Sequence, residues 1–173
     1  MTPRVVLVGL PGAGKSTTGR RLAKILAVPF ADSDDLVEAA DGRTVREIFA
    51  ESGEAAFRAA ECAAISDALT GFDGVLALGG GALTHDGTRS AVAASGVPVV
   101  LLRAALATLG VRVGDAQSRP LLAGDAAARL AELELERAPV YAELADLTVD
   151  TDGRTPGQIA ATVAARLHNS GRL

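Results

Sequence analysis

Apolar stretches alternate with helical patterns along this chain. Five short, mostly apolar runs lie at residues 5–8, 30–32, 74–78, 97–102 and 147–150. Between the runs, apolar residues recur at helical spacing, as Leu22, Ile25 and Leu26 do in the helix predicted over 18–26. Strands that are buried on both faces and alternate with helices form a mostly parallel sheet. The pattern therefore predicts an α/β domain whose ligands gather beyond the carboxyl ends of the strands.

A glycine-rich segment follows the first run. Residues 9–17 read Gly-Leu-Pro-Gly-Ala-Gly-Lys-Ser-Thr, which fits the phosphate-loop pattern G-x-x-x-x-G-K-[ST] between a strand and a helix. Glycines let successive N–H groups turn inward around a phosphate at the helix N-terminus. Lys15 adds a charge between the β- and γ-phosphates, and Ser16 offers a hydroxyl to Mg²⁺. A turn that binds nothing is the alternative, which the intact flanks disfavour.

Two carboxylates follow the second apolar run. Asp32 and Asp34 stand at the carboxyl end of a predicted strand. The phosphate loop follows the carboxyl end of another strand, so we expect the two carboxylates to face it. We expect one carboxylate to reach the water shell of the metal and the other to reach a substrate hydroxyl. Alternatively, Ser33 or Asp34 only caps a helix that starts at Asp35.

Two isolated arginines are candidates for binding an anionic substrate. Arg58 lies on the helix predicted over 54–69, where Glu61 at i+3 can orient its guanidinium. Spacing alone leaves open that Arg58 is a solvated surface residue. Arg137 lies on a later helix, in which Pro139 predicts a break that aims Arg137 at a ligand.

Three consecutive glycines, residues 79–81, end the third apolar run. Glycine loses more conformational freedom on folding than any other residue, so three in a row need a reason. We expect a ligand to come close to the bare backbone here and to accept hydrogen bonds from its N–H groups. A flexible loop is the alternative.

A polar segment over 112–124 has glycines near both ends and carries Arg119 beside Pro120. This composition predicts a mobile lid. An arginine on such a lid can neutralise charge on a phosphoryl group during its transfer, an effect worth about 10³ to 10⁵ in rate for an arginine finger. An ordinary surface loop is the alternative.

Composition and charge exclude some classes of binding partner. The net charge of −4 and the pI near 5.2 leave no broad basic field for nucleic acid or a membrane surface. No apolar run approaches the ~18 residues of a membrane span, and the apolar start belongs to the phosphate loop rather than to a cleavable signal. Cys62 fits a half-buried helix position, and His85 and His168 are expected at the surface. We therefore expect one cytoplasmic domain over 1–173, and a monomer.

Together these segments resemble the shikimate kinase family. The resemblance rests on the phosphate loop, Asp32-Ser33-Asp34, Arg58, the triple glycine, Arg119-Pro-Leu-Leu and Arg137-Ala-Pro-Val-Tyr141, and it runs from about residue 4 to 168. It implies a three-layer P-loop kinase fold, with a five-stranded parallel sheet in the order 2-3-1-4-5 flanked by helices. It also implies a substrate-binding segment over about 33–61 and a mobile lid over about 112–124.

The same resemblance implies the reaction and the role of each residue. The γ-phosphoryl group of ATP would move to the 3-hydroxyl of shikimate, giving ADP, with Mg²⁺ as cofactor. Catalysis would fall to Lys15, Asp34 and Arg119, and the metal to Ser16 and Asp32. The residues expected at ATP are Gly12, Ala13, Gly14, Lys15, Ser16, Thr17, Arg112, Arg119 and Arg154. Those expected at shikimate are Asp34, Arg58, Gly79, Gly80, Gly81 and Arg137.

Two other classes of protein remain as alternatives. Another small-molecule P-loop kinase, acting on gluconate or a nucleoside monophosphate, is the nearest, since gluconate also carries a carboxylate and hydroxyls. The triple glycine followed by Arg119-Pro-Leu-Leu is unlike the gluconate kinases, and a nucleotide acceptor needs a base-binding pocket and more lid arginines than the one or two here. A nucleotide-dependent switch or an inactive kinase-like module has no use for Lys15, Asp34 and Arg119 together.

Overall fold

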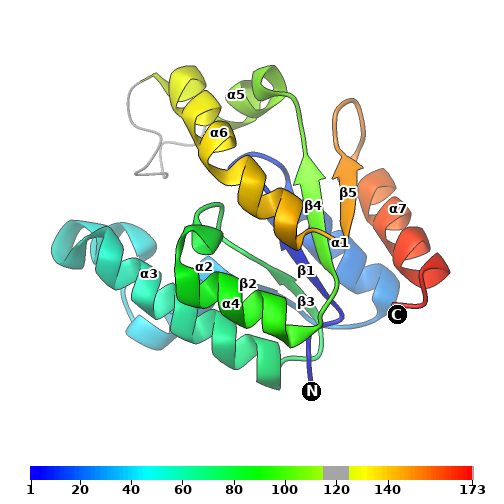
Figure 1. The fold of residues 1–173 in the computed structure, drawn as a ribbon, viewed down its shortest axis with the longest axis horizontal. Helices are drawn as coiled ribbons and strands as arrows, with labels where there is room; N and C mark the ends of the chain where they lie inside the picture. The colour runs from blue at the N-terminus through cyan, green and yellow to red at the C-terminus, as the bar shows by residue number, and fades with distance from the viewer. Residues whose placement is uncertain (115–124, 173) are drawn as a thin grey trace.

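A parallel sheet of five strands organises the fold (Figure 1), and the computed structural model describes residues 1–114 and 125–172. All four neighbouring pairs are parallel, and the order across the sheet is β2-β3-β1-β4-β5, so the expected topology is confirmed. The strands are β1 (Val5–Val8), β2 (Phe30–Asp32), β3 (Val75–Ala77), β4 (Val99–Arg103) and β5 (Leu147–Asp150).

Helices cover both faces of the sheet and form the two outer layers. Helices α1 and α7 pack together behind the strands in Figure 1, and α4 and α6 cross the front. No helix in the ranges 1–114 and 125–172 is long and apolar enough to cross a membrane. The helices are α1 (Lys15–Leu26), α2 (Ser33–Asp41), α3 (Val45–Gly71), the short 3₁₀ helix η1 (Ala82–Thr84), α4 (Asp86–Ser95), α5 (Leu106–Gly114), α6 (Ala126–Leu144) and α7 (Pro156–Asn169).

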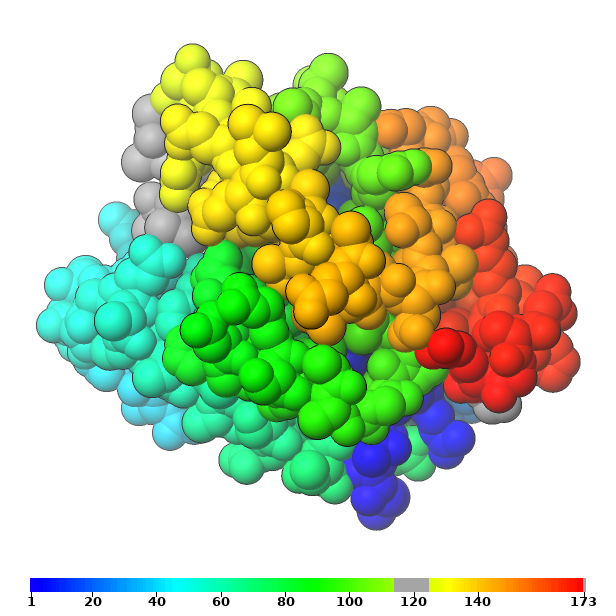
Figure 2. All heavy atoms as spheres, viewed as in Figure 1, coloured from blue at the N-terminus to red at the C-terminus, as the bar shows by residue number. Residues whose placement is uncertain are grey.

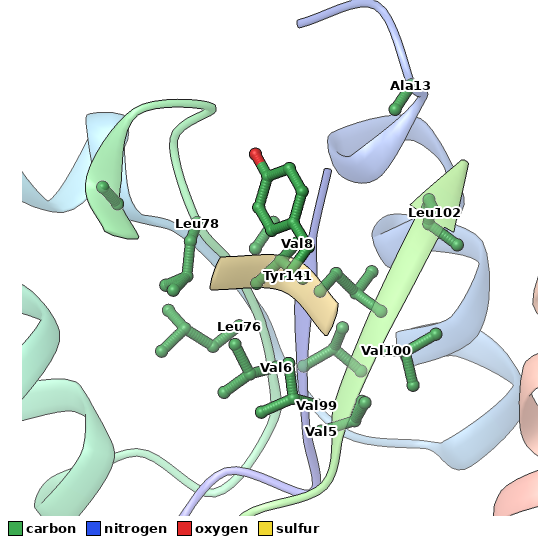
Figure 3. Packing of buried hydrophobic residues seen from close by; sticks show 14 of the residues in the cluster. Val5, Val6, Val8, Ala13, Leu76, Leu78, Val99, Val100, Leu102 and Tyr141 are labelled. Carbon is green, nitrogen blue, oxygen red and sulfur yellow. The ribbon is translucent and has the colours of Figure 1, made fainter. Parts of the chain in front are cut away.

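The core is centred on β1. All four of its side chains are buried, which is the pattern of a central parallel strand covered on both faces. Valines and leucines of β3 and β4 pack beside them, and the ring of Tyr141 from α6 lies above β1 (Figure 3). Because the middle of the sheet accepts no polar side chain, the polar residues of these strands stand at their carboxyl ends.

The segment expected to bind substrate has a small core of its own. Val37 of α2 packs with Ile48 and Phe57 of α3, and this cluster is separate from the main core. Thr44 caps α3 and forms the expected capping box with Glu47. Two predicted helices are joined in α3 across a kink, where residue 53 has φ 82° and ψ 171°.

One sequence prediction about an element is wrong. Helix α6 is not broken at Pro139; Leu135, four residues earlier, is 80% exposed, so the carbonyl that loses its helical partner lies on the solvent side. Helix α2 begins at Ser33 and Asp32 provides its cap, so the alternative in which Ser33 or Asp34 caps a helix that starts at Asp35 does not hold. Residues 112–114 of the predicted lid belong to α5, and the remaining lid residues, 115–124, lie outside the described ranges.

An apolar hollow lies between α6, β4 and α5 (Figure 2) and has a volume of about 350 Å³. Leu10 and Ala13 of the phosphate loop contribute to its lining, together with Leu102, Leu109 and Tyr141. Because the lining is mostly apolar, the hollow does not suit charged substrates.

Candidate active site

The phosphate loop has the geometry of an anion cradle. Gly12 and Gly14 adopt left-handed backbone conformations, with φ of 82° and 89°, which a residue with a β-carbon rarely adopts. Helix α1 begins at Lys15, so its N-terminal N–H groups face the loop. The Lys15 Nζ atom donates to the carbonyls of Gly9 (2.8 Å) and Leu10 (3.1 Å), which places its charge over the loop. The loop is therefore ready to receive a phosphate chain.

Ser16 and Asp32 meet at the edge of this cradle. Ser16 Oγ donates a hydrogen bond of 2.5 Å to Asp32 Oδ2, and Asp32 Oδ1 accepts from the backbone N–H of Asp34 at 3.2 Å. Asp32 therefore caps α2 and contacts the phosphate loop at the same time. A hydroxyl and a carboxylate side by side fit Mg²⁺, which takes one or two protein oxygens and completes its shell with water and phosphate. No group of three metal-ligating side chains of His, Cys, Asp or Glu occurs in the described residues.

Asp34 lies at the start of α2, next to the glycines of residues 79–81. A β-carbon on Gly79 would lie 3.0 Å from Asp34 Oδ1, so the carboxyl faces that loop. Burial raises the pKa of Asp34 from 3.8 to about 6; the negative charges of Asp32 and Glu61 add to the rise, and Lys15 and Arg58 oppose it. A half-buried carboxyl with this pKa can accept a proton near neutral pH.

Arg58 is buried, so the surface interpretation of this residue is wrong. It is 8% exposed, and its Nη1 donates a 2.5 Å hydrogen bond to Oε2 of Glu61, which is 1% exposed. Glu61 Oε1 accepts a second hydrogen bond, of 3.1 Å, from Ser33 Oγ. The predicted orientation of Arg58 by Glu61 is thus present, and the pair is buried because each charge has a partner.

The triple glycine allows other side chains to come close. A β-carbon on Gly79 would lie 2.5 Å from Glu61 Oε1, and one on Gly80 would lie 3.0 Å from a ring carbon of Pro11 in the phosphate loop. A β-carbon on Gly81 would overlap Arg58 Nη2. Each glycine thus faces a different part of the site, and space rather than an unusual backbone conformation excludes larger residues here.

Arg58 and Arg137 converge at Gly81. Arg137 Nη2 lies 3.2 Å from the place that a β-carbon on Gly81 would take, and Arg58 Nη2 contacts the same place. Arg137 is buried, which lowers its pKa, and its Nη1 donates to the carbonyl of Gly80 at 2.7 Å. The Nε atoms of both arginines are buried and make no hydrogen bond among the described residues, although Arg58 Nε lies 3.6 Å from Glu54 Oε1 in an ion pair. Two guanidinium groups with spare donors form a site for a carboxylate.

The other residues expected at ATP make separate contacts. Arg112, in α5, donates to the carbonyl of Gly12 and to Thr151 Oγ1, each at 3.2 Å, and so bridges the phosphate loop and the end of β5. Arg154 donates to Asp150 O and to residues of α7 instead. Thr17 is exposed at the start of α1, and Arg119 lies outside the described residues.

Sequence reasoning missed two buried hydroxyls at the site. Ser33 was considered only as a helix cap, although its hydroxyl accepts from the N–H of Gly79 at 2.8 Å. Tyr141 donates from its hydroxyl to the carbonyl of Gly80 at 3.1 Å. The signal for Tyr141 was its place one helical turn after Arg137. No local signal reveals the partner of Ser33, which lies 46 positions away.

The histidines and the cysteine lie away from these groups. His168 is exposed, as expected. His85 is half-buried rather than a surface residue, because it precedes α4 and packs against Gly87, and its Nδ1 has no partner among the described residues. Cys62 is half-buried, as the helical pattern predicts.

Comparison with known proteins identifies a family. The family model described as shikimate kinase matches residues 11–168. A shikimate kinase of Mycobacterium avium is 50% identical over 169 residues, covering 96% of this chain and 94% of that protein. One from Salinispora tropica is 50% identical over 167 residues, covering 96% of this chain and 99% of that protein.

Solved structures agree with this result. The shikimate kinase of Acinetobacter baumannii in complex with shikimate has a TM-score of 0.93 at 32% identity, covering 98% of this chain and 94% of that one. A gluconokinase of Sinorhizobium meliloti has a TM-score of 0.54 at 18% identity, covering 96% of this chain and 95% of that one. At this identity, the similarity to the gluconokinase shows a shared fold only.

The raised pKa of Asp34 predicts a pH-dependent stability. Because the native pKa of about 6 lies above the ordinary 3.8, the native state binds more protons between about pH 4 and 6, and the free energy of unfolding falls as pH rises through that window. Asp34→Asn removes the ionisable carboxyl and with it the free-energy cost of holding a buried negative charge above pH 6. We expect the variant to gain about 1 to 3 kcal/mol at pH 7, from about 1.4 kcal/mol per pKa unit, and to gain little at pH 4.

Urea unfolding of both proteins at pH 4 and pH 7 measures this difference. Asp35→Asn, which alters an exposed neighbour on the same helix, is the control and should change little at either pH. An equal effect of Asp34→Asn at the two pH values would contradict the raised pKa.

Proposed function

The chain belongs to the shikimate kinase family, and we propose that the groups assembled around its glycine loop (residues 79–81) and phosphate loop (residues 9–17) carry out the reaction of that family. The enzyme is an ATP-using kinase of the shikimate pathway. It transfers the γ-phosphoryl group of ATP to the 3-hydroxyl of shikimate. The observation that carries the assignment of the acceptor site is the convergence of Arg58 and Arg137 at Gly81, beside Asp34.

We infer that ATP binds with its phosphates in the phosphate loop. The N–H groups at the start of α1 and the Lys15 ammonium would surround the β- and γ-phosphates. Gly12, Ala13, Gly14 and Thr17 would contribute backbone or hydroxyl contacts. Arg112, which already bridges the loop and Thr151, would lie on the nucleotide side, and Arg154 would close the adenine end from the turn before α7.

Ser16 and Asp32 would hold Mg²⁺, directly or through its water shell. The bound ion supplies positive charge between the phosphates, which reduces repulsion as the γ-phosphoryl group leaves. The 2.5 Å hydrogen bond from Ser16 to Asp32 keeps the two oxygen ligands together before the ion arrives.

Shikimate would bind between α2, α3 and α6. The carboxylate would pair with Arg58 and Arg137, whose Nη2 atoms converge at Gly81. The N–H groups of Gly80 and Gly81 would donate to oxygens of the substrate, since neither donates to a protein acceptor within the described residues. Asp34 would bind the reacting hydroxyl and accept its proton, which its raised pKa permits near neutral pH.

Arg119 falls outside the described residues, so its role at the transferred phosphoryl group stays a prediction from the family pattern. Closure of a lid carrying it would exclude water, which competes with shikimate as an acceptor. The monomeric state and a cytoplasmic location, where ATP is available, also stay predictions.

The reaction is tested by ADP release from Mg-ATP with shikimate, gluconate, AMP or GMP. We expect rapid release with shikimate alone, because the chain belongs to the shikimate kinase family; gluconate is the sharpest comparison, since it also carries a carboxylate and hydroxyls. Lys15→Ala is the control for a contaminating kinase and should abolish the release. Release with gluconate or a nucleotide instead would refute the assigned acceptor.

Asp34→Asn tests the acceptor-side carboxylate. The substitution preserves size and removes the proton acceptor, so we expect turnover to fall at least 100-fold, on the order of a lost general base. The affinity for ATP, measured by calorimetry, should stay within about twofold, since Asp34 makes no contact with phosphate in this proposal. Asp35→Asn provides the matched control, and near-normal turnover of Asp34→Asn would remove Asp34 from its role.

Arg58→Ala tests the carboxylate site. Loss of a charge-assisted bidentate contact should raise the KM for shikimate at least tenfold, about 1.4 kcal/mol or more, and leave the KM for ATP unchanged. Arg46→Ala alters an exposed arginine on the same helix and serves as the control. An unchanged KM for shikimate in a folded Arg58→Ala protein would show that the carboxylate binds elsewhere.

A further inference from the structure

Two buried hydroxyls hold the glycine loop at the adjacent residues Gly79 and Gly80. Ser33 Oγ accepts the N–H of Gly79 at 2.8 Å, and Tyr141 Oη donates to the carbonyl of Gly80 at 3.1 Å. They come from different elements, α2 and α6. The loop is therefore tied to both sides of the site.

Core packing determines where the Tyr141 hydroxyl lies. The ring is buried in the main core above β1, and its oxygen points toward the carboxyl ends of the strands (Figure 3). Burial raises the pKa of Tyr141 to about 12, so the hydroxyl keeps its proton and remains a donor at neutral pH. Arg137 Nη1 donates to the same Gly80 carbonyl at 2.7 Å, which gives that oxygen two donors from one face of α6.

The orientation of the Gly80 carbonyl sets the direction of a free donor. The carbonyl of Gly80 and the N–H of Gly81 belong to one planar peptide group, and in a trans peptide they point in opposite directions. With the carbonyl held toward α6, the Gly81 N–H points away from α6. This N–H has no protein acceptor within the described residues.

The other hydroxyl connects the loop to Arg58. Ser33 is fully buried, and while it accepts from Gly79 it donates to Glu61, the residue that pairs with Arg58. A hydroxyl has one proton, and here it is used toward Glu61, which leaves the lone pairs for the Gly79 N–H. Loss of this hydroxyl would therefore release both the loop and the partner of Arg58.

We propose that Ser33 and Tyr141 are positioning residues that hold the glycine loop with its free N–H groups directed at the acceptor substrate, without touching the substrate themselves. The inference rests on the proposed acceptor site. It predicts that the two hydroxyls affect shikimate rather than ATP, although Gly80 also touches Pro11 of the phosphate loop.

The test compares Tyr141→Phe and Ser33→Ala with the unaltered protein. Tyr141→Phe keeps the ring in the core and removes only the donor. We expect each variant to raise the KM for shikimate about 3- to 10-fold, the usual range for one hydrogen bond, and to leave the KM for ATP within twofold. Ser33→Thr keeps the hydroxyl and should restore the KM, which a general loss of packing would not allow.

Amide NMR of the unliganded protein gives a readout independent of activity. The Gly81 N–H resonance should move in Tyr141→Phe, because the Gly80 carbonyl of the same peptide group then keeps only one of its two donors from α6, Arg137. Thr88→Val removes a buried hydroxyl that has no hydrogen-bond partner in residues 1–114 and 125–172 and lies outside the proposed site, and it should change neither this resonance nor either KM. Wild-type values of both KM constants in folded Tyr141→Phe and Ser33→Ala would overturn the inference.

The outcome also separates this inference from the proposed function. If the unaltered protein releases no ADP with shikimate, the proposed acceptor site fails. If the unaltered protein is active and the hydroxyl variants raise the KM for ATP as much as that for shikimate, the positioning of acceptor donors fails while the reaction stands.

Discussion

The acceptor side of the site depends on the buried carboxylate of Glu61. A charge that is 1% exposed is stable only when its oxygens are paired, and here Arg58 Nη1 and Ser33 Oγ occupy them. This one group determines the rotamer of Arg58, the direction of the Ser33 hydroxyl and, through it, the position of Gly79. Three elements that are distant in sequence, α2, α3 and the end of β3, are thereby held together.

Strand order brings this assembly to the phosphate loop. Because β3 lies between β2 and β1, the glycine loop after β3 has the Asp32–Asp34 turn on one side and the phosphate loop on the other. Gly80 packs against Pro11, so the loops expected to carry acceptor and donor are in direct contact. Although the protein is acidic overall, three positive charges gather around the two loops. Hydrogen bonds to backbone carbonyls hold Lys15 and Arg137, and a hydrogen bond to Glu61 holds Arg58.

Much of the fold could be predicted from the sequence, because its signals are local. The apolar run of β1, the capping box at Thr44 and the phosphate-loop pattern each depend on neighbouring residues. The predicted break at Pro139 was wrong because solvent exposure of the helix decides how much a missing hydrogen bond costs, and exposure is not a local property. Arg58 looked like a surface residue for the same reason, since its burial requires a partner carboxylate that is itself buried.

The sequence by itself determined the class of fold, the phosphate loop and the resemblance to shikimate kinase, since motifs and hydrophobic periodicity depend only on the order of residues along the chain. It also singled out Asp34, Arg58, the triple glycine and Arg137 as candidates for one site. Only the tertiary structure decided how these groups meet: that Arg58 and Arg137 converge at Gly81, and that the hydroxyls of Ser33 and Tyr141 hold the loop between them. The physical reason is that hydrogen bonds and desolvation depend on distances across the sheet, where partners lie 46 and 61 positions apart in the chain.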